Sequence, residues 1–360
     1  MTALIVHSAD PLNAETPLAR LRERFITGQG DFYVRSHGSI PATGGAQHRL
    51  SVQGRVARPL ELSMAELRSR FAQRRVTAAM QCAGNRRADL QAVSPVSGDP
   101  WAPGAIGNAE WTGVALADVL RAAEVEVGAG EELHVGFGAL DSVTENGRTF
   151  RYGVSIPLAK ALSSEVLLAW AMNGSPLTPQ HGFPLRAVVP GYAGVRSAKW
   201  LGSIEIRDAP SECPIQADDY KLHPAAETDA DPSHALTIPA LTINDMPLNS
   251  AICEPAPHAS LPPGPTRLRG YAISTTLPLS RVEISADAGR SWIQAALEQA
   301  RSPWSWSFWE AIIPLGKGRH DLVVRAWDGA GQTQPASPDE VWNHRGYLCN
   351  AWHRVSVTVA

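Results

Sequence analysis

The sequence predicts an α+β protein of two domains, a mixed α/β domain over residues 1–245 and an all-β domain over residues 246–360. Its 360 residues are enough for two hydrophobic cores. Short helical and strand patterns follow one another in the first part, without the regular βαβ rhythm of a doubly wound sheet. Only strand patterns follow residues 208–249, whose Pro, Asp and Ala content indicates an irregular crossover between the domains.

The first domain opens with a strand and a capped helix. Apolar and polar residues alternate over 48–56, which is the pattern of a half-buried strand. Ser63 and Glu66, three residues apart, form the signature of a capping box at a helix start. Leu62 and Leu67 are spaced to form the hydrophobic staple that accompanies such a box, so a helix is expected after Ser63.

Three further elements complete the first domain. Residues 76–82 are expected to form a buried strand that ends at Cys82. Residues 114–123 place apolar side chains on one helical face, which predicts a helix. Residues 165–172 form a short apolar run into Asn173-Gly174, which predicts a strand followed by a turn.

The second domain is expected to be an immunoglobulin-like sandwich of seven strands. Residues 281–285 alternate and lead into the turn signal of residues 287–289. Residues 322–327 and 355–359 have the same period of two. Several short strands at this spacing favour a sandwich over a helical domain.

Aromatic residues are concentrated in this second part. Trp304, Trp306 and Phe308 alternate with serines, so one strand is expected to carry all three rings on one face. The chain has 11 tryptophans in all, which favours thick cores.

Composition excludes several classes of function. With 44% hydrophobic and 19% charged residues, the chain has the balance of a soluble globular protein. Its net charge of −3 gives no support for nucleic-acid binding or a polybasic membrane contact, and no apolar run reaches membrane-spanning length. The first thirty residues lack a signal-peptide pattern, which favours the cytoplasm, or the periplasm if a leader has been removed.

The four cysteines are Cys82, Cys213, Cys253 and Cys349. They are far apart and form no C-x-x-C pair, which excludes a zinc ribbon, an iron–sulfur motif and a thioredoxin-like site. The spacing is not that of a disulfide framework and favours a reducing compartment. Nucleotide, nicotinamide and flavin binding have no support either, since the chain contains neither G-x-G-x-x-G nor a P-loop.

The segment Met80-Gln81-Cys82-Ala83-Gly84-Asn85-Arg86-Arg87 is the most informative part of the chain. It places a cysteine at a strand end, then a Gly-Asn turn, then two guanidinium groups. Fixed cations favour the thiolate, which suits a nucleophile or a soft metal ligand. A lone cysteine is more often an inert buried side chain, and the residues by themselves leave both interpretations open.

This segment resembles the molybdenum-ligand loop of the sulfite oxidase family. Similar segments run in family order along almost the whole chain: Phe32–Arg35, Trp101–Ile106, Met172–Gly174, His181–Arg186, Lys199–Gly202, Asp219–Lys221, Trp342–Gly346 and Asn350–Val355. The resemblance implies a molybdopterin-binding domain followed by an immunoglobulin-like dimerisation domain, and hence a homodimer. It further implies oxidation of sulfite to sulfate by oxygen-atom transfer.

The resemblance also assigns roles to residues. Cys82 is expected to bind molybdenum, with one pyranopterin dithiolene and two oxo groups completing the metal site. Arg35, Arg87 and Arg345 fall on the anion-pocket arginines, with Trp101 and Tyr220 beside them. Arginine suits a small oxyanion because its charge is permanent and its donor fork matches paired oxygens.

Ten residues match positions that hold the cofactor: Tyr33, Arg35, Ser36, His37, Asp141, His181, Arg186, Ser197, Ala198 and Lys199. Arg186 and Lys199 are expected at the phosphate, and Asp141 at pterin N–H groups. His37 and His181 have an alternative as satisfied core histidines.

The resemblance leaves the electron acceptor and the reaction open. Neither a haem nor a flavin module is expected, so electrons are expected to pass to oxygen or to an external cytochrome. One alternative is a nitrate reductase-type or other molybdopterin reductase, because such enzymes share the cysteine loop. Another is a non-catalytic cofactor-binding or interaction protein.

Overall fold

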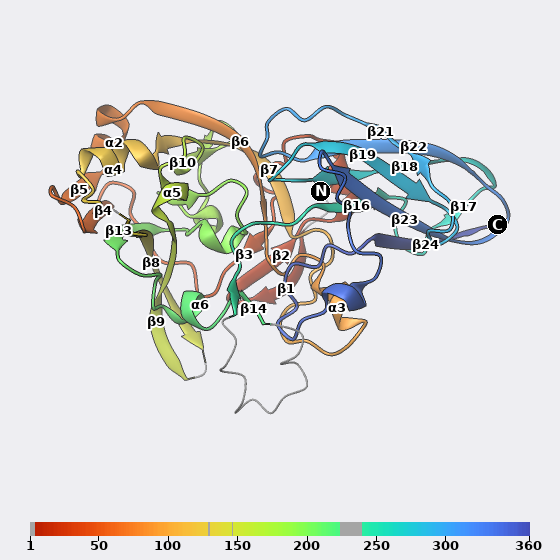
Figure 1. The fold of residues 1–360 in the computed structure, drawn as a ribbon, viewed down its shortest axis with the longest axis horizontal. Helices are drawn as coiled ribbons and strands as arrows, with labels where there is room; N and C mark the ends of the chain where they lie inside the picture. The colour runs from red at the N-terminus through yellow and green to blue at the C-terminus, as the bar shows by residue number, and fades with distance from the viewer. Residues whose placement is uncertain (1–3, 129, 146, 224–239) are drawn as a thin grey trace.

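The computed structural model describes residues 4–360 except 129, 146 and 224–239. Two lobes lie along the long axis, and the C-terminus lies at the far end of the second one (Figure 1). No helix among the described residues is both long and apolar enough to cross a bilayer. The limits predicted for the two domains, at residues 245 and 246, stay a prediction.

Most strands of the first domain belong to two larger sheets and a small N-terminal one. The first large sheet has the order β5 (Leu60–Ser63), β4 (Arg49–Gly54), β13 (Leu201–Arg207), β8 (His134–Glu145), β9 (Arg148–Pro157). The second has the order β11 (Ser175–Pro176), β10 (Leu167–Met172), β7 (Ile106–Ala115), β6 (Gln73–Gln81), with β12 (Arg186–Val188) also on β10. The N-terminal sheet has the order β1 (Ile5–Ala9), β2 (Leu12–Glu15), β3 (Val34–Arg35).

Helices in this domain are short. They are α1 (Leu18–Glu23), α2 (Met64–Arg70), α3 (Arg87–Gln91), α4 (Leu116–Ala122), α5 (Leu158–Ala161) and α6 (Pro214–Ala217), with 3-10 turns η1 (Pro179–His181) and η2 (Gly194–Arg196). In the predicted crossover, α6 is followed by the small ladder β14 (Lys221–Leu222) with β15 (Leu241–Thr242). The rest of that crossover is irregular or lies outside the described residues.

The predicted start of α2 is confirmed in detail. Ser63 Oγ accepts from the Glu66 amide, and the Glu66 carboxylate accepts from the Ser63 amide at 2.8 Å. Leu62 and Leu67 are both fully buried. The strand predicted over 48–56 is also confirmed, because β4 buries Leu50 and Val52 on one face.

The helix predicted over 114–123 was wrong at its start. Val114 and Ala115 continue β7, where Val114 pairs with Gln73 of β6, and the helix begins only at Leu116. Strand pairing along both edges of β7 takes these residues out of the helical pattern. The strand predicted over 165–172 is confirmed as β10, and Asn173 and Gly174 form its turn with φ of 55° and 77°.

The second domain consists of two facing sheets of four and five strands, so the predicted number of seven strands was wrong. One has the order β16 (Asn249–Glu254), β18 (Gly264–Ile273), β22 (Ser307–Leu315), β21 (Ala296–Leu297). The other has the order β17 (Ser260–Leu261), β24 (His353–Val359), β23 (Gly318–Asp328), β19 (Leu279–Ser285), β20 (Ile293–Gln294), and the turn η4 (Pro338–Val341) precedes β24. Apolar side chains of both sheets, such as Trp309 and Val324, form one buried cluster between them.

The prediction for the three aromatic rings was wrong for Trp304. Trp306 and Phe308 share a cluster with Leu21 of α1 and Ile106 of β7, so this side of the sheet packs against the first domain. Trp304 lies in a turn before β22 and packs instead against the cluster that contains Cys82. Its carbonyl accepts from the Ala79 amide of β6, and this bond to the first domain replaces strand pairing.

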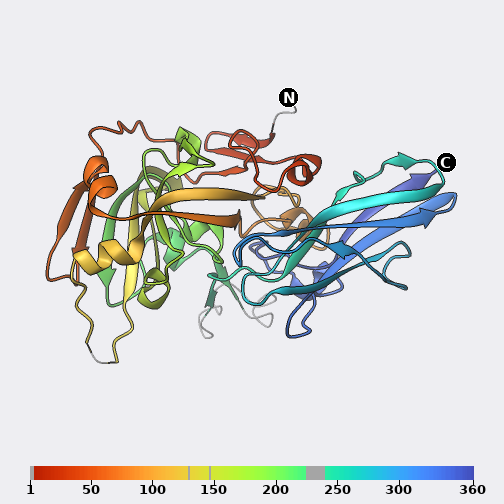
Figure 2. The ribbon, with the colours of Figure 1, turned by 90° about the horizontal axis from the view of Figure 1, so that it is seen from above.

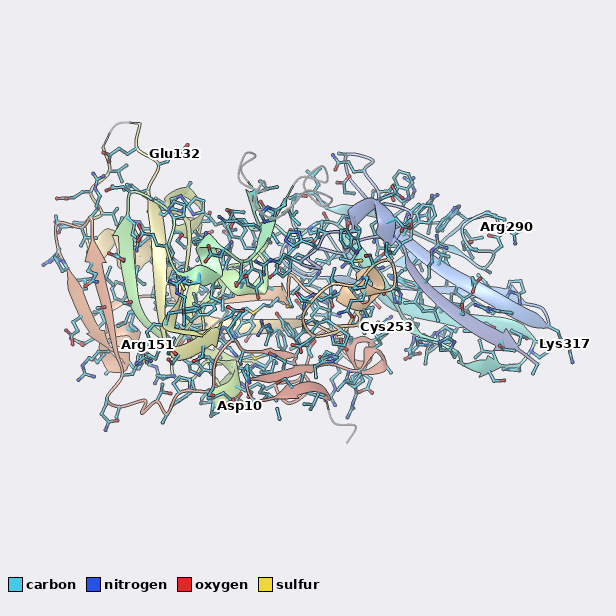
Figure 3. The ribbon with its side chains drawn as sticks, turned by 90° about the horizontal axis from the view of Figure 1, so that it is seen from below. Asp10, Glu132, Arg151, Cys253, Arg290 and Lys317 are labelled. Atoms are coloured by element: carbon cyan, nitrogen blue, oxygen red, sulfur yellow. The ribbon has the colours of Figure 1, made fainter. Side chains whose placement is uncertain are left out.

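The N-terminal segment and the buried Arg86 join the two lobes. Figure 2 shows the N-terminal segment above the junction, and Arg22 of α1 forms an ion pair with Glu298 of the second domain at 3.1 Å. Arg86 is fully buried, with φ of 66°, and donates to Asn249 Oδ1 and the Ala351 carbonyl. Cys253 lies near the same junction, and Lys317 lies at the far end of the second lobe (Figure 3).

Removing the carboxylate that accompanies Arg86 is expected to destabilise the protein. Asp89 Oδ2 accepts from Arg86 Nε at 2.8 Å, so Asp89→Ala leaves a buried cation without its counter-charge. We expect a loss of about 3 kcal/mol in the free energy of unfolding, measured by chemical denaturation. The control is Asp118→Ala, whose partner Arg121 is 69% exposed. That exposed pair is expected to contribute less than about 1 kcal/mol, and equal losses in the two variants would contradict the prediction.

Candidate functional site

Cys82 lies at the end of β6, in a loop held by a second loop. The Cys82 amide donates to the Ala105 carbonyl at 2.9 Å, and the Asn85 side chain accepts from the Ala105 amide at 3.0 Å. The Gly84 amide points at Cys82 Sγ from 3.4 Å. The thiol is 5% exposed, and these backbone contacts fix its position.

Cys82 faces a cavity in the first domain, whose empty space of about 640 Å³ includes its opening to solvent. Eleven of the residues predicted from the sequence line it: Tyr33, Arg35, Ser36, His37, Cys82, Asp141, His181, Arg186, Ser197, Lys199 and Tyr220. They come from segments far apart in the chain, between β3 and α6–β14. The inert-cysteine alternative would leave the thiol facing only hydrocarbon, and the cavity wall beside it is polar and cationic.

Four predicted residues are not brought to the cavity wall. Ala198 is buried in the large apolar cluster of the first domain. Trp101 is fully buried behind Cys82, and its ring contacts His7 edge-on at 4.8 Å. Arg345 forms an ion pair with Asp219 at 3.1 Å and is 39% exposed.

Arg87 is the fourth predicted residue that does not line the cavity. Its Nε donates to the Gly346 carbonyl at 3.3 Å and its Nη1 to the Asp99 carbonyl at 3.2 Å. The guanidinium carbon lies 5.5 Å from the centre of the Tyr347 ring.

The cavity contains cations that still have hydrogen-bond donors to offer. Arg35 Nη1 donates to Asn13 Oδ1 and to the Ser36 carbonyl, and its other N–H groups have no partner among the described residues. Lys199 Nζ donates to Ser36 Oγ at 2.7 Å and to the Gln180 carbonyl at 3.0 Å, which leaves one of its three N–H groups. Burial and the nearby Arg186 charge hold the pKa of Lys199 well below its usual value. An anion in this space would relieve that repulsion.

Arg186 and His181, which were expected to bind the cofactor, already form hydrogen bonds within the protein. Arg186 donates to the carbonyls of His181 and Ser197, each at 3.0 Å, and burial lowers its pKa to about 10. Burial lowers the pKa of His181 to about 3, so this imidazole is neutral at physiological pH. Its Nε2 lies 3.0 Å from the Gln29 carbonyl, which requires the Nε2–H tautomer and leaves Nδ1 as an acceptor.

Tyr220 lines the same cavity. Its hydroxyl is 2.8 Å from His37 Nε2, and burial lowers the pKa of His37 well below its usual value, with Arg35 and Lys199 adding to the effect. Either group can donate in this bond, depending on which nitrogen of the neutral imidazole carries its hydrogen. Tyr220 itself has φ of 50°, an uncommon conformation for an aromatic residue, which fixes where its ring points.

The surroundings of Asp141 indicate whether a polar cofactor fits the cavity. Asp141 Oδ1 is buried and has no hydrogen-bond partner within the part of the chain that the structure describes. Burial raises the pKa of Asp141 to about 6, with Lys199 opposing the shift. An unpaired buried acceptor next to cations fits a ligand that brings its own N–H donors and negative groups, as molybdopterin does. Cys82, Lys199 and Asp141 thus offer what the predicted cofactor needs.

Asp141 also predicts a pH dependence in cofactor-free protein. Its folded pKa of about 6 lies above the ordinary value of 3.8, so burial of the charged form opposes folding at high pH. Below about pH 4 the Asp141 carboxyl is protonated in both the folded and the unfolded protein. Above about pH 6, burying its charged form lowers the free energy of unfolding by about 2–3 kcal/mol. Asp141→Asn is therefore expected to be more stable than wild type at pH 8, with the difference vanishing near pH 4, in denaturant titrations. The prediction would be contradicted if the difference in stability between Asp141→Asn and wild type stayed constant from pH 4 to pH 8. It would also be contradicted if Asp208→Asn, at a 73% exposed site, showed the same pH dependence.

Some residues around the cavity were missed by the sequence analysis. Met80, Tyr152 and Gln180 line it. Met80 precedes Cys82 by two residues, so the period of β6 could have placed it on the same side. Tyr152 and Gln180 carried no local signal, because only tertiary contacts bring β9 and η1 to the cavity.

Among the described residues, Cys82 is the one cysteine that lines the cavity. Across residues 4–360, apart from the gaps given above, no group of three or more His, Cys, Asp and Glu side chains converges on a metal-binding point. All four cysteines are free.

Comparison with known proteins gives matches over the whole chain. A family model described as "Oxidoreductase molybdopterin binding domain" matches residues 37–215, and one described as "Mo-co oxidoreductase dimerisation domain" matches residues 240–360. Sulfite oxidase of Gallus gallus is 42% identical over 98% of this chain and 77% of that protein. Sulfite oxidase of Arabidopsis thaliana is 35% identical over 98% of this chain and 93% of that protein.

A solved structure agrees with these matches. The sulfane dehydrogenase SoxCD from Paracoccus pantotrophus superimposes with a TM-score of 0.81 at 26% identity, over 98% of this chain and 88% of that one. The arrangement of a molybdopterin-binding domain followed by a dimerisation domain therefore holds for the fold as well as for the sequence.

Proposed function

Because the chain belongs to the sulfite oxidase family of molybdopterin oxidoreductases, we propose that it oxidises sulfite to sulfate. The observation that carries the proposal is the position of Cys82 in the wall of a cavity that also holds Arg35 and Lys199. A soft sulfur ligand beside the permanent positive charge of Arg35 suits a high-valent metal and a small dianionic substrate.

The residues of the cavity divide into two sets. Cys82 would hold the molybdenum, while Lys199, Asp141 and Ser36 would bind the pyranopterin and its phosphate. When bound, this cofactor supplies oxygen-atom transfer and two-electron redox chemistry. Arg186 would act chiefly by fixing the carbonyls of His181 and Ser197, since its Nε and both terminal nitrogens already donate within the protein.

The substrate would be oriented by the second set. Arg35 is half-buried and has N–H groups without a partner among the described residues, so it would take the sulfite oxygens and offset their charge. Tyr220, hydrogen-bonded to neutral His37, would place one hydroxyl at the anion. Arg345 and Arg87, which lie outside the cavity wall, would contribute charge from a greater distance.

Further proposals concern the second domain and the electrons. We propose that its two facing sheets form an immunoglobulin-like sandwich through which two copies of the chain associate. The description of the matched dimerisation domain supports this, and sedimentation analysis would test it. Electrons would leave to oxygen or to an external cytochrome.

Steady-state assays of purified protein would test the function. Sulfite and nitrate would be compared, with ferricyanide, cytochrome c and oxygen as acceptors for sulfite and a reduced dye as donor for nitrate. Turnover with sulfite only is expected. Turnover with nitrate alone would favour the reductase alternative. Less than about a tenth of an equivalent of molybdenum after cofactor-replete expression would favour the non-catalytic alternative, since a true site fills by mass action.

A further inference from the structure

Tyr347 lies between Arg87 and the cavity. Its ring stacks on Tyr220 with the centroids 4.9 Å apart and the planes at 18°. The Arg87 guanidinium lies 5.5 Å from the centre of the same ring. Tyr220 lines the cavity, whereas neither Tyr347 nor Arg87 does. The order from the cavity outward is therefore Tyr220, Tyr347, Arg87.

The loop that carries Tyr347 is fixed on both sides. Asn343 Oδ1 accepts from the Tyr347 amide at 3.0 Å, and Asn343 Nδ2 donates to the Tyr347 carbonyl at 2.8 Å. The next residue, Leu348, donates its amide to the Ala83 carbonyl at 2.7 Å, inside the loop that carries Cys82. The ring is 7% exposed and belongs to the same apolar cluster as Tyr220. Such a side chain has one available position.

All three arginines predicted for the anion pocket act on this phenol. Burial raises the pKa of Tyr347, Asp219 adds to the rise, and Arg87, Arg345 and Arg35 oppose it. A phenol ring has a negative face, so it can lie against a guanidinium on one side and pack against another ring on the other. Tyr347 is therefore within electrostatic reach of all three arginines, of which Arg35 lines the cavity and Arg87 and Arg345 do not.

We propose that Tyr347 is a positioning residue of the anion site, through which Arg87 holds the plane of Tyr220 and so keeps the Tyr220 hydroxyl on His37 and toward the anion. The inference rests on the proposed function. It assigns the role to the aromatic face of Tyr347 and not to its hydroxyl, because the stack and the cation contact both use the ring.

Two substitutions separate the ring from the hydroxyl. Tyr347→Phe keeps the stack, and its sulfite KM, kcat and sulfate Kd are expected within about twofold of wild type. Tyr347→Leu removes both ring contacts and is expected to raise the sulfite KM and the sulfate Kd about 5–10-fold, with kcat changed less than about threefold. The sulfate Kd is measured by calorimetry on the molybdenum-loaded protein. Trp327→Leu, which removes a ring 4.1 Å from Arg281 in the second domain, is the control expected to leave all three constants unchanged.

A double-mutant cycle tests the link to Arg87. Arg87→Gln is expected to raise the sulfate Kd of the wild-type protein. In the Tyr347→Leu background, the fold-increase in Kd caused by Arg87→Gln is expected to be smaller by a factor of at least about three. Equal effects in both backgrounds would overturn the proposal, as would a Tyr347→Phe variant as impaired as Tyr347→Leu. Tyr347→Met serves as a second ring-free variant if Tyr347→Leu loses its cofactor. Loss of molybdenum from both, with normal sulfate Kd in the loaded fraction, would also reject it.

The same measurements keep the two hypotheses apart. A wild-type protein that binds sulfate but does not oxidise sulfite would refute the proposed function, and the ring dependence of sulfate Kd would still decide the role of Tyr347. A wild-type protein that oxidises sulfite with constants indifferent to the ring would refute only the positioning role.

Discussion

Cys82→Ser is expected to lower sulfite turnover by more than about 100-fold, because even residues behind a metal ligand cost 10–100-fold when replaced. A hydroxyl is a poor substitute for a thiolate on a soft site, and it is not ionised at neutral pH. The substitution removes one sulfur from a loop whose backbone contacts stay in place. The melting temperature of the cofactor-free protein is therefore expected to change by less than about 4 °C.

The matched control is Cys253→Ser. Cys253 is equally buried but lies at the junction of the lobes, away from the cavity wall. It is expected to retain activity per molybdenum, even if stability falls. Sulfite turnover, molybdenum content and thermal melting would be measured for both variants. Undiminished sulfite oxidation by Cys82→Ser would end the assignment of Cys82 as the metal ligand.

Arg35→Gln is expected to cause the second largest loss. Burial lowers the pKa of Arg35, but its interactions with Tyr220 and other neighbouring groups outweigh burial and raise the pKa overall, so the side chain stays charged. Truncating one partner of a buried charge pair typically costs 2–4 kcal/mol, which corresponds to a loss of about 30-fold to 1,000-fold in kcat/KM for sulfite. Most of the loss is expected in KM, since the anion meets this charge before reaction.

A conservative variant and a distant one complete the test of Arg35. Arg35→Lys restores the charge without the planar donor fork and is expected to recover only part of the activity. Arg319→Gln, at a 74% exposed site in the second domain, is expected to leave kcat/KM within about twofold. Sulfite kinetics at several salt concentrations provide the measurement. A KM for Arg35→Gln equal to that of wild type would show that this guanidinium does not bind the substrate.

Local signals in the sequence were reliable where one short segment specified one structure. The capping box of Ser63 and Glu66 and the turn at Asn173 formed as predicted. Prediction was wrong where a distant segment competed. Val114 had a helical neighbourhood but pairs with β6, and Trp304 had a strand neighbourhood but packs on the first domain.

The cationic residues show the same division. Adjacent arginines follow Cys82, and their order in the sequence does not tell where each side chain goes. Arg86 is turned by its φ of 66° into the junction with Asn249, whereas Arg87 points to Tyr347. Tyr347 itself carried no signal, because its role depends on a loop of the second domain lying against the Cys82 loop.

The cysteine loop, the family and eleven of the lining residues could be predicted from residue types at fixed spacing alone. Which charges reach the cavity, and which stay outside its wall, depends on how distant segments fold together. Arg35 and Lys199 reach it, while Arg87 and Arg345 are held by carbonyl groups and by Asp219. The physical reason is that a buried guanidinium goes where acceptors and rings satisfy it, and those partners come from distant parts of the chain.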